Sequence, residues 1–368
     1  MMKRLCLSVA VGSIVLGFLA CGHRAYAGTA APEQAPLFVG GEGGYHTYRI
    51  PALLVTAKGI VLAFCEGRRN NGKDRGDIDL LLKRSTDHGR TWSGTQVVWG
   101  EEGETTIGNP CPVQNTSTGT VWLGFCRNND RVFVTQSDDH GVSWATPREI
   151  TANVKREGWT WYATGPVHGI QLESGRLLMP CDHEREGDGT KYSHAIHSDD
   201  HGKTWTLGGI VGYRNGECAA VQTIDGRVHM NTRCYFGKHR RGVAWSDDGG
   251  DTWTEVGAAE QLVEPVCQAS VARLSGSGDG RETRILFSNP ASEQRKNMTV
   301  RLSYDECRTW SSGKVLYPGP SAYSDLAVTQ DGAILCLYER GMETPYETIT
   351  LARFGLDWLE PRPETPVP

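Results

Sequence analysis

The chain has 368 residues, with 38 basic and 43 acidic side chains, so its formal net charge is −5. This length allows one large domain or two ordinary ones. Because acidic side chains outnumber basic ones, the composition gives no indication of a nucleic-acid or membrane-surface partner. An anionic ligand would need a local cluster of arginines.

The first 27 residues have the pattern of an export signal. A short positive region precedes Leu5, an apolar run continues to Ala20, and Ala25-Tyr26-Ala27 is a small-x-small cleavage site. The apolar run of roughly 16 residues is too short for a stable transmembrane helix. We therefore expect residues 1–27 to be a signal peptide and residues 28–368 to form a single exported domain without a transmembrane segment.

A second interpretation of this segment stays open. Cys21 follows Leu19-Ala20, so it is also a candidate for acylation. Acylation would make the protein a cell-surface lipoprotein, whereas cleavage after Ala27 would release it to the periplasm or the medium.

Five copies of one pattern, Ser-x-Asp-x-Gly-x-Thr-Trp with small variations, follow along the chain. They begin at Ser85, Ser137, Ser198, Ser246 and Ser303, so their spacings are 52, 61, 48 and 57 residues. A period of about 50 residues in a chain of short strands is typical of a β-propeller with one repeat per blade. Dividing the mature chain by the mean period predicts an all-β, six-bladed propeller in which one blade lacks the pattern.

The pattern, which we call the box, has the chemistry of a hairpin turn. Its Ser and Asp side chains can hydrogen bond to the turn's own backbone, and its Gly takes a positive φ at low cost. The Trp can then bury its ring between neighbouring blades. A role repeated five times around a ring cannot be one active site, so we expect scaffold rather than catalytic or calcium-binding residues. Cys307 replaces the Gly in the fifth box, which indicates a relaxed or strained turn.

Short runs of branched and aromatic residues between turn signals predict the strands. These runs are Ala52–Val55, Ile60–Cys65, Asp79–Arg84, Thr120–Cys126, Arg131–Ser137, Arg176–Pro180, Val228–Arg233, Ile285–Phe287 and Ala333–Tyr338. No convincing amphipathic helix is present. We expect a strand near Ala35–Val39 to pair with the C-terminal segment and so close the ring.

The cysteines give no sign of a disulfide framework or a metal site. Nine of the eleven lie after residue 27, an odd and unpatterned set without C-x-x-C or Cys/His spacing. We expect most of them to be small apolar residues inside strands. No cofactor and no metal are predicted.

Several polar segments are unlike a scaffold. They are Tyr48-Arg49-Ile50-Pro51, Glu66-Gly67-Arg68 with the loop to Asp79, Asn215-Gly216-Glu217 with the later Arg233, Ser288–Arg295, and Ser321-Ala322-Tyr323-Ser324-Asp325. Taken with the boxes, these segments resemble the exo-sialidases (neuraminidases), particularly the bacterial secreted glycosidases that remove terminal sialic acid. The resemblance covers essentially the whole mature chain and implies a six-bladed propeller.

The resemblance implies that four arginines bind the sugar. Arg49, Arg233 and Arg295 match the three that grip the carboxylate of sialic acid, and planar guanidinium groups suit that task. Arg68 matches a further arginine beside the carboxylate and the sugar's 4-position. Arg301 lies close to Arg295 and competes for the third place.

The resemblance also implies three catalytic residues. Tyr323 matches the nucleophile, Glu217 the base that activates it, and Asp74 the general acid/base. Asp77 and Asp79 compete with Asp74, although Asp79 begins a strand and suits an orienting role better.

Two other segments have open interpretations. Trp159-Thr160-Trp161-Tyr162 could line the pocket for the N-acetyl or glycerol group, or belong to the core between blades. Asp182-His183 could lie at the pocket rim, or be a satisfied loop pair.

The sequence thus predicts a monomeric, metal-independent, retaining exo-α-sialidase acting on glycoproteins, glycolipids or oligosaccharides. One alternative is a trans-sialidase, which in known examples carries an appended lectin domain for which no room follows Trp358. Another is a non-catalytic sialic-acid-binding propeller, against which the presence of Asp74, Glu217 and Tyr323 together argues. The linkage preference and the sialic acid variant stay open.

Overall fold

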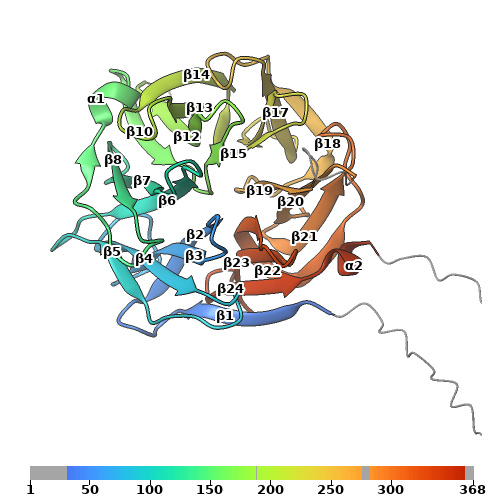
Figure 1. Ribbon diagram of the computed structural model, residues 1–368, viewed down its shortest axis with the longest axis horizontal. Coiled ribbons are helices and arrows are strands. Elements are labelled where there is room, and N and C mark those ends of the chain that lie inside the picture. Colours follow the sequence, from blue (N-terminus) through green and yellow to red (C-terminus); the bar gives the residue numbers. More distant parts are fainter. Residues whose placement is uncertain (1–30, 188, 276–281, 361–368) are drawn as a thin grey trace, which may run out of the picture.

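A computed structural model describes residues 31–187, 189–275 and 282–360, and it consists almost wholly of antiparallel β-strands arranged in a ring (Figure 1). The predicted signal peptide and Cys21 lie outside these residues. In the described part, the two helices, α1 (Thr151–Val154) and α2 (Leu356–Leu359), have four residues each, and no helix is long and apolar enough to cross a membrane.

Four of the sheets follow one another along the chain. The first contains β2 (Thr47–Val55), β3 (Val61–Arg68), β4 (Ile78–Ser85) and β5 (Gln96–Trp99), and the second β6 (Ile107–Gln114), β7 (Val121–Arg127), β8 (Arg131–Ser137) and β9 (Arg148–Glu149). The third contains β10 (Trp159–Thr164), β12 (Leu177–Arg185), β13 (Lys191–Ser198) and β14 (Thr206–Tyr213), with β11 (Ile170–Gln171) paired to β12. The fourth contains β15 (Asn215–Gln222), β16 (Val228–Cys234), β17 (Arg240–Ser246) and β18 (Gly257–Val263).

The last sheet has seven strands and closes the ring. It contains β19 (Ser270–Ser275), β20 (Arg284–Pro290), β21 (Lys296–Ser303), β22 (Lys314–Val328), β23 (Ile334–Arg340), β24 (Thr348–Phe354) and β1 (Glu33–Val39). The long strand β22 pairs with β21 up to Pro320 and with β23 from Ser321 onward. Pairing of β1 with β24 joins the two ends of the described chain, as expected. The all-β, propeller-like architecture is therefore confirmed.

The boxes form the turns that the sequence predicts. In the first, the Ser85 hydroxyl accepts from Gly89 N at 2.9 Å and donates to Asp87 at 2.7 Å. Asp87 also accepts from the backbone N–H of Thr91 at 2.8 Å and from its hydroxyl at 2.6 Å. Both carboxylate oxygens are thus used within the turn. The same bonds recur in the other four boxes, and Cys307 keeps the turn with a φ of 68°, so the fifth turn is strained rather than relaxed.

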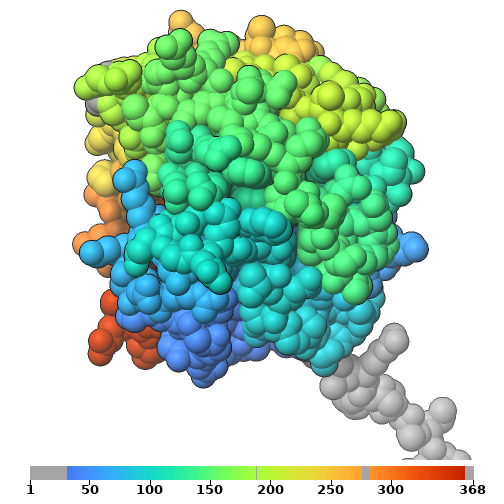
Figure 2. Space-filling view, turned by 90° about the vertical axis from the view of Figure 1, so that its left-hand side faces the viewer, coloured from blue at the N-terminus to red at the C-terminus, as the bar shows by residue number. Residues whose placement is uncertain are grey.

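Box tryptophans pack between neighbouring sheets. Trp144 of the second sheet meets Phe64 of the first edge to face, with ring centroids 5.8 Å apart, and Trp205 meets Trp122 in the same way at 6.4 Å. Figure 2 shows consecutive segments of the chain, blue to yellow-green, packed directly against one another on one side of the molecule. The nine described cysteines are all buried and free.

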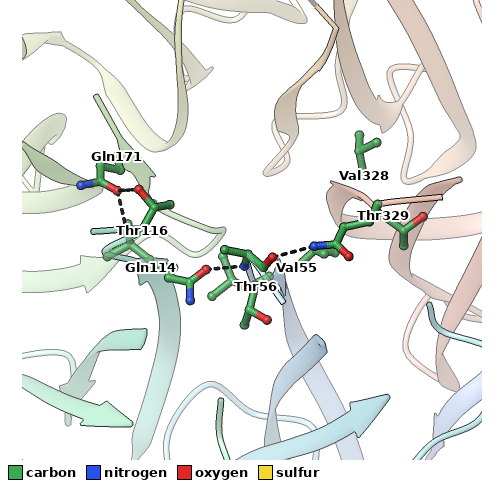
Figure 3. A pocket seen from close by; sticks show the side chains of 12 residues that line it. Val55, Thr56, Gln114, Thr116, Gln171, Val328 and Thr329 are labelled. Carbon is green, nitrogen blue, oxygen red and sulfur yellow. Dashed lines mark hydrogen bonds between the residues drawn. The ribbon is translucent and has the colours of Figure 1, made fainter. Parts of the chain in front are cut away.

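Glutamine side chains also join neighbouring sheets, at the ends of β2, β6 and β22 (Figure 3). Gln330 Nε2 donates to Ala57 O at 2.6 Å, and Ala57 N donates to Gln114 Oε1 at 2.7 Å. Gln171 Oε1 accepts from the backbone N–H and the hydroxyl of Thr116 at 2.8 and 2.7 Å. These bridges surround a cavity of about 370 Å³, and because their amides are already hydrogen bonded we interpret them as ties between sheets.

We expect Asp248→Ala, in the fourth box, to lower the free energy of unfolding by about 1–2 kcal/mol, because Ser246 and two donors of Thr252 lose their acceptor. Asp247→Ala is the matched control, since it removes the same charge from an exposed neighbour in the same turn. Urea denaturation should show a lower midpoint for Asp248→Ala alone. Equal shifts for both variants would mean that charge, not the turn's hydrogen bonds, determines the change.

Candidate functional site

The seven candidate residues lie at one face of the ring. Because antiparallel strands alternate in direction, the start of the first strand in a sheet and the end of the second lie at the same face, and the turn after the third lies at the opposite one. Arg49 starts β2, Arg68 ends β3 and Arg233 lies near the end of β16. The box turns are therefore on the far face, which agrees with a scaffold role.

A tyrosine, a carboxylate and an arginine form the centre of the site. The Tyr323 hydroxyl donates a hydrogen bond to Glu217 Oε1. Arg233 Nη1 donates to Glu217 Oε2 at 2.7 Å and to the Tyr323 oxygen at 3.2 Å. Tyr323 is 5% exposed. Glu217 on β15 and Tyr323 on β22 are 106 residues apart in sequence.

The electrostatics give the two groups opposite protonation states. Burial, and then the charge of Glu217, raise the pKa of Tyr323 well above its usual value, although Arg233 lowers it. Burial acts to raise the pKa of Glu217, but Arg233 and the bond from Tyr323 outweigh burial, so the pKa is lowered. The site thus holds a neutral phenol against a carboxylate that can accept its proton.

A buried carboxylate that the sequence alone did not identify, Glu339, orients the candidate residues Arg49 and Tyr323. Glu339, at the end of β23, accepts from Arg49 Nε at 2.6 Å and from Ile50 N at 2.9 Å through Oε1. Its other oxygen accepts from Tyr323 N at 3.1 Å. In the sequence, Glu339 is visible only as an acidic residue after the apolar run Ile334–Tyr338. Nothing in that local pattern indicates which residues it contacts.

Asp74 lies in the loop after β3, beside two arginines. Its Oδ1 is 2.7 Å from Arg68 Nη1 and 3.7 Å from Arg49 Nη1, while its side chain is 68% exposed. Partial burial raises the pKa of Asp74, but Arg68 and then Arg49 outweigh it, and the pKa is lowered. Arg68 is itself held by the buried Glu66 at 2.7 Å, and Asn109 N donates to Glu66 at 2.9 Å.

The two competing aspartates lie elsewhere. Asp79 accepts from the Tyr45 hydroxyl at 2.6 Å and from Arg69 Nη2 at 2.5 Å, and Asp77 forms an ion pair with Arg69 at 3.4 Å. Both carboxylates are therefore engaged by Arg69. The structure brings Asp74, and neither competitor, to Arg49 and Arg68.

The third arginine at the centre is Arg295. Its guanidinium carbon is 5.6 Å from the centre of the Tyr323 ring, and that of Arg49 is 5.1 Å from it. Arg301 is buried on β21 and donates to Asn289 at 3.3 Å. With Arg233, three guanidinium groups thus surround Tyr323.

The two segments whose roles the sequence left open, residues 159–162 and Asp182-His183, belong mainly to the interior of the protein. Trp159 stacks on His183 with ring centroids 3.4 Å apart, and Tyr162 is fully buried. Trp161 is half-buried, with Lys191 Nζ 5.5 Å from its ring centre. Asp182 and His183 lie within β12 and are buried, so they are strand residues and not a loop pair.

Across the described ranges, no group of three or more His, Cys, Asp or Glu side chains is arranged to hold a metal ion. The side chains that the site brings together are a largely buried phenol–carboxylate pair, a more exposed carboxyl and several guanidinium groups.

Comparisons with known proteins agree on one relationship. Residues 59–336 match the model of the BNR repeat-like domain. The chain is 34% identical over 358 residues to a sialidase of Micromonospora viridifaciens, covering 89% of this chain but only 54% of that protein. It is 31% identical to an exo-alpha-sialidase of Arthroderma benhamiae, covering 86% and 85%. The solved structure of the Hadza microbial sialidase Hz136 matches with a TM-score of 0.81 at 27% identity, covering 89% of this chain and 69% of that one.

The electrostatic coupling in the centre can be measured directly. Glu217→Gln should lower the pKa of Tyr323, because it removes a charge that disfavours the phenolate while Arg233 and Arg295, which favour it, remain. The ultraviolet absorbance of phenolate, taken as the difference from a Tyr323→Phe counterpart, reports this titration. Asp305→Asn removes a carboxylate on the far face and is the control. An unchanged Tyr323 titration in Glu217→Gln would contradict the geometry.

Proposed function

The chain belongs to the sialidase family of glycoside hydrolases, and on that premise we propose that it is a retaining exo-α-sialidase that hydrolyses terminal α-linked sialic acid from glycans. One observation carries the proposal: the Tyr323 hydroxyl is hydrogen bonded to Glu217 inside a set of three arginines. A protein that only bound the sugar would need the arginines but not a phenol paired with a base.

The arginines supply recognition of the substrate's carboxylate. Arg49, Arg233 and Arg295 concentrate positive charge at one place on a chain whose formal net charge is negative. Guanidinium groups bind carboxylates through paired, charge-assisted hydrogen bonds that lysine cannot reproduce. We assign Arg68 to the neighbouring position, where it holds Asp74 at 2.7 Å.

Tyr323 is the proposed nucleophile. The anomeric carbon of sialic acid carries the carboxylate, so an anionic nucleophile would be repelled as it approached, whereas a neutral phenol is not. Sialidases are the known exception, with a tyrosine nucleophile, to the two-carboxylate rule of glycosidases. As the bond from the Tyr323 oxygen to the anomeric carbon forms, Glu217 takes the phenolic proton.

Asp74 is the proposed general acid and base. In the first step it gives its proton to the glycosidic oxygen as the bond to the anomeric carbon breaks. In the second step it takes a proton from the attacking water, while the Tyr323 oxygen leaves and recovers its proton from Glu217. Two displacements give net retention. Arg68 and Arg49 lower the pKa of Asp74 in the free protein, so a substrate carboxylate that neutralises Arg49 favours the protonated acid.

We interpret the architecture as six blades. The change of partner at Pro320/Ser321 in β22 supports this count, because it divides the seven-stranded sheet into β19–β22 and β22–β23–β24–β1. The second of these runs contains no box, as the sequence predicts. The proposed site residues share one face of the ring, because they lie at the starts of first strands, at the ends of second strands, or in the loops that follow second strands.

The proposed substrate is defined by its terminal sugar. The assigned residues recognise one carboxylate and one anomeric centre, so glycoproteins, glycolipids and oligosaccharides all qualify. We propose that the protein acts outside the cytoplasm as a monomer. Nuclear magnetic resonance of the products separates hydrolysis from trans-sialylation, because an acceptor sugar would replace water in the second step.

The carboxylate-binding role can be tested by substitution. Replacing Arg49, Arg233 or Arg295 by Ala should lower kcat/KM by ten- to hundredfold or more, since each loses one or two charge-assisted bonds worth roughly 1.5–3 kcal/mol each. The measurement is cleavage of a fluorogenic sialoside by each purified variant.

Arg301→Ala is the matched control for Arg295→Ala. It removes an arginine from the same region that does not reach Tyr323, so kcat/KM should stay near the wild-type value in the folded protein. Near-normal activity of Arg295→Ala together with collapse of Arg301→Ala would show that the third arginine is misassigned.

A further inference from the structure

The three central arginines differ in what holds them. Arg49 is paired with the buried Glu339 at 2.6 Å, and Arg233 with Glu217 at 2.7 Å. Among the described residues Arg295 forms no ion pair, and the one hydrogen bond of its side chain goes from Nη1 to the Tyr346 hydroxyl at 2.7 Å. The orientation of Arg295 therefore depends on a neutral phenol.

Tyr346 touches a second arginine with its ring. The guanidinium carbon of Arg49 lies 4.2 Å from the centre of that ring. The ring also packs against the buried cluster of Ile50, Cys267, Ala322 and Tyr323. One side chain thus links two central arginines to the apolar surroundings of Tyr323.

The loop that carries Tyr346, between β23 and β24, is well braced. The Glu347 carboxylate accepts from the backbone N–H groups of Met342, Glu343 and Thr344 at 3.0, 2.8 and 2.9 Å. These bonds lower the pKa of Glu347, so the brace stays ionised at neutral pH. Glu347 O also accepts from Gly40 N at 2.9 Å. The loop therefore presents Tyr346 in a fixed position.

A phenol can orient Arg295 without neutralising its positive charge, whereas a carboxylate cannot. A carboxylate beside Arg295 would orient it but would also neutralise the charge that an anionic ligand needs. A neutral oxygen fixes the direction of one N–H and leaves the full positive charge for the ligand.

We propose that Tyr346 is a positioning residue of the carboxylate site, which holds Arg295 ready for the anion while leaving its charge unpaired. The inference rests on the proposed sialidase function, and it adds a residue that the sequence resemblance does not identify. Tyr346 acts through Arg295 and, by stacking, through Arg49.

The test compares Tyr346→Phe, which keeps the ring and removes only the hydroxyl, with Tyr346→Ala, which removes both. For Tyr346→Phe, KM for a fluorogenic sialoside and the inhibition constant of free N-acetylneuraminic acid should each rise about five- to tenfold, with kcat within about twofold. Tyr346→Ala should raise both further, because the contact with Arg49 is lost too. Tyr304→Phe removes a phenolic hydroxyl that bonds Glu360 instead, and is the matched control.

A double substitution separates positioning from a merely structural role. In an Arg295→Ala background, Tyr346→Phe should cause no additional rise in KM, since its effect passes through Arg295. Unchanged KM and inhibition constants in Tyr346→Phe, or a full additional loss in the double variant, would overturn the inference. If the wild type is active and Tyr346→Phe behaves normally, only this inference fails, whereas a wild type that neither cleaves nor binds sialosides refutes the proposed function.

Discussion

The concentration of positive charge around Tyr323 is the constraint on which the rest of the structure depends. Guanidinium groups that are removed from water are strongly destabilising unless carboxylates or other acceptors pair with them. Glu339 and Glu217 provide that pairing for Arg49 and Arg233. Glu339 also accepts backbone N–H groups, so the charge is fixed relative to the strands and not only to the arginine.

The ring makes this arrangement possible by bringing together strand ends that are distant in sequence. The nucleophile candidate is on β22, its base on β15 and its acid in the loop after β3, so any slip between sheets would separate them. The box turns, the interleaved tryptophans and the glutamine bridges all lie away from the site and resist such slips. The pairing of β1 with β24 fixes the last sheet to the N-terminal strand. The contacts that hold the sheets together thus lie away from the face that carries the candidate site residues.

Much of the architecture could be predicted because its determinants are local. The box encodes its turn within eight residues, and alternating apolar runs such as Arg131–Ser137 mark strands directly. Short outer strands such as β9 (Arg148–Glu149) carry no such signal, because two exposed residues show no periodicity. The seven candidate residues were found by resemblance, and the structure brings them to one face. Glu339 and Tyr346 were missed because their importance comes only from side chains contacted across the ring.

The most direct test of the central claim, that Tyr323 attacks the anomeric carbon, is covalent trapping by a 3-fluorosialosyl fluoride. The fluorine beside the anomeric centre slows both displacements, and the fluoride leaving group restores only the first, so the intermediate accumulates. After tryptic digestion, mass spectrometry should find the adduct on Tyr323 in the peptide 315–340, and Tyr323→Phe should abolish it. A label on Asp74 or Glu217, or an active enzyme that remains unlabelled and inverts configuration, would contradict the account.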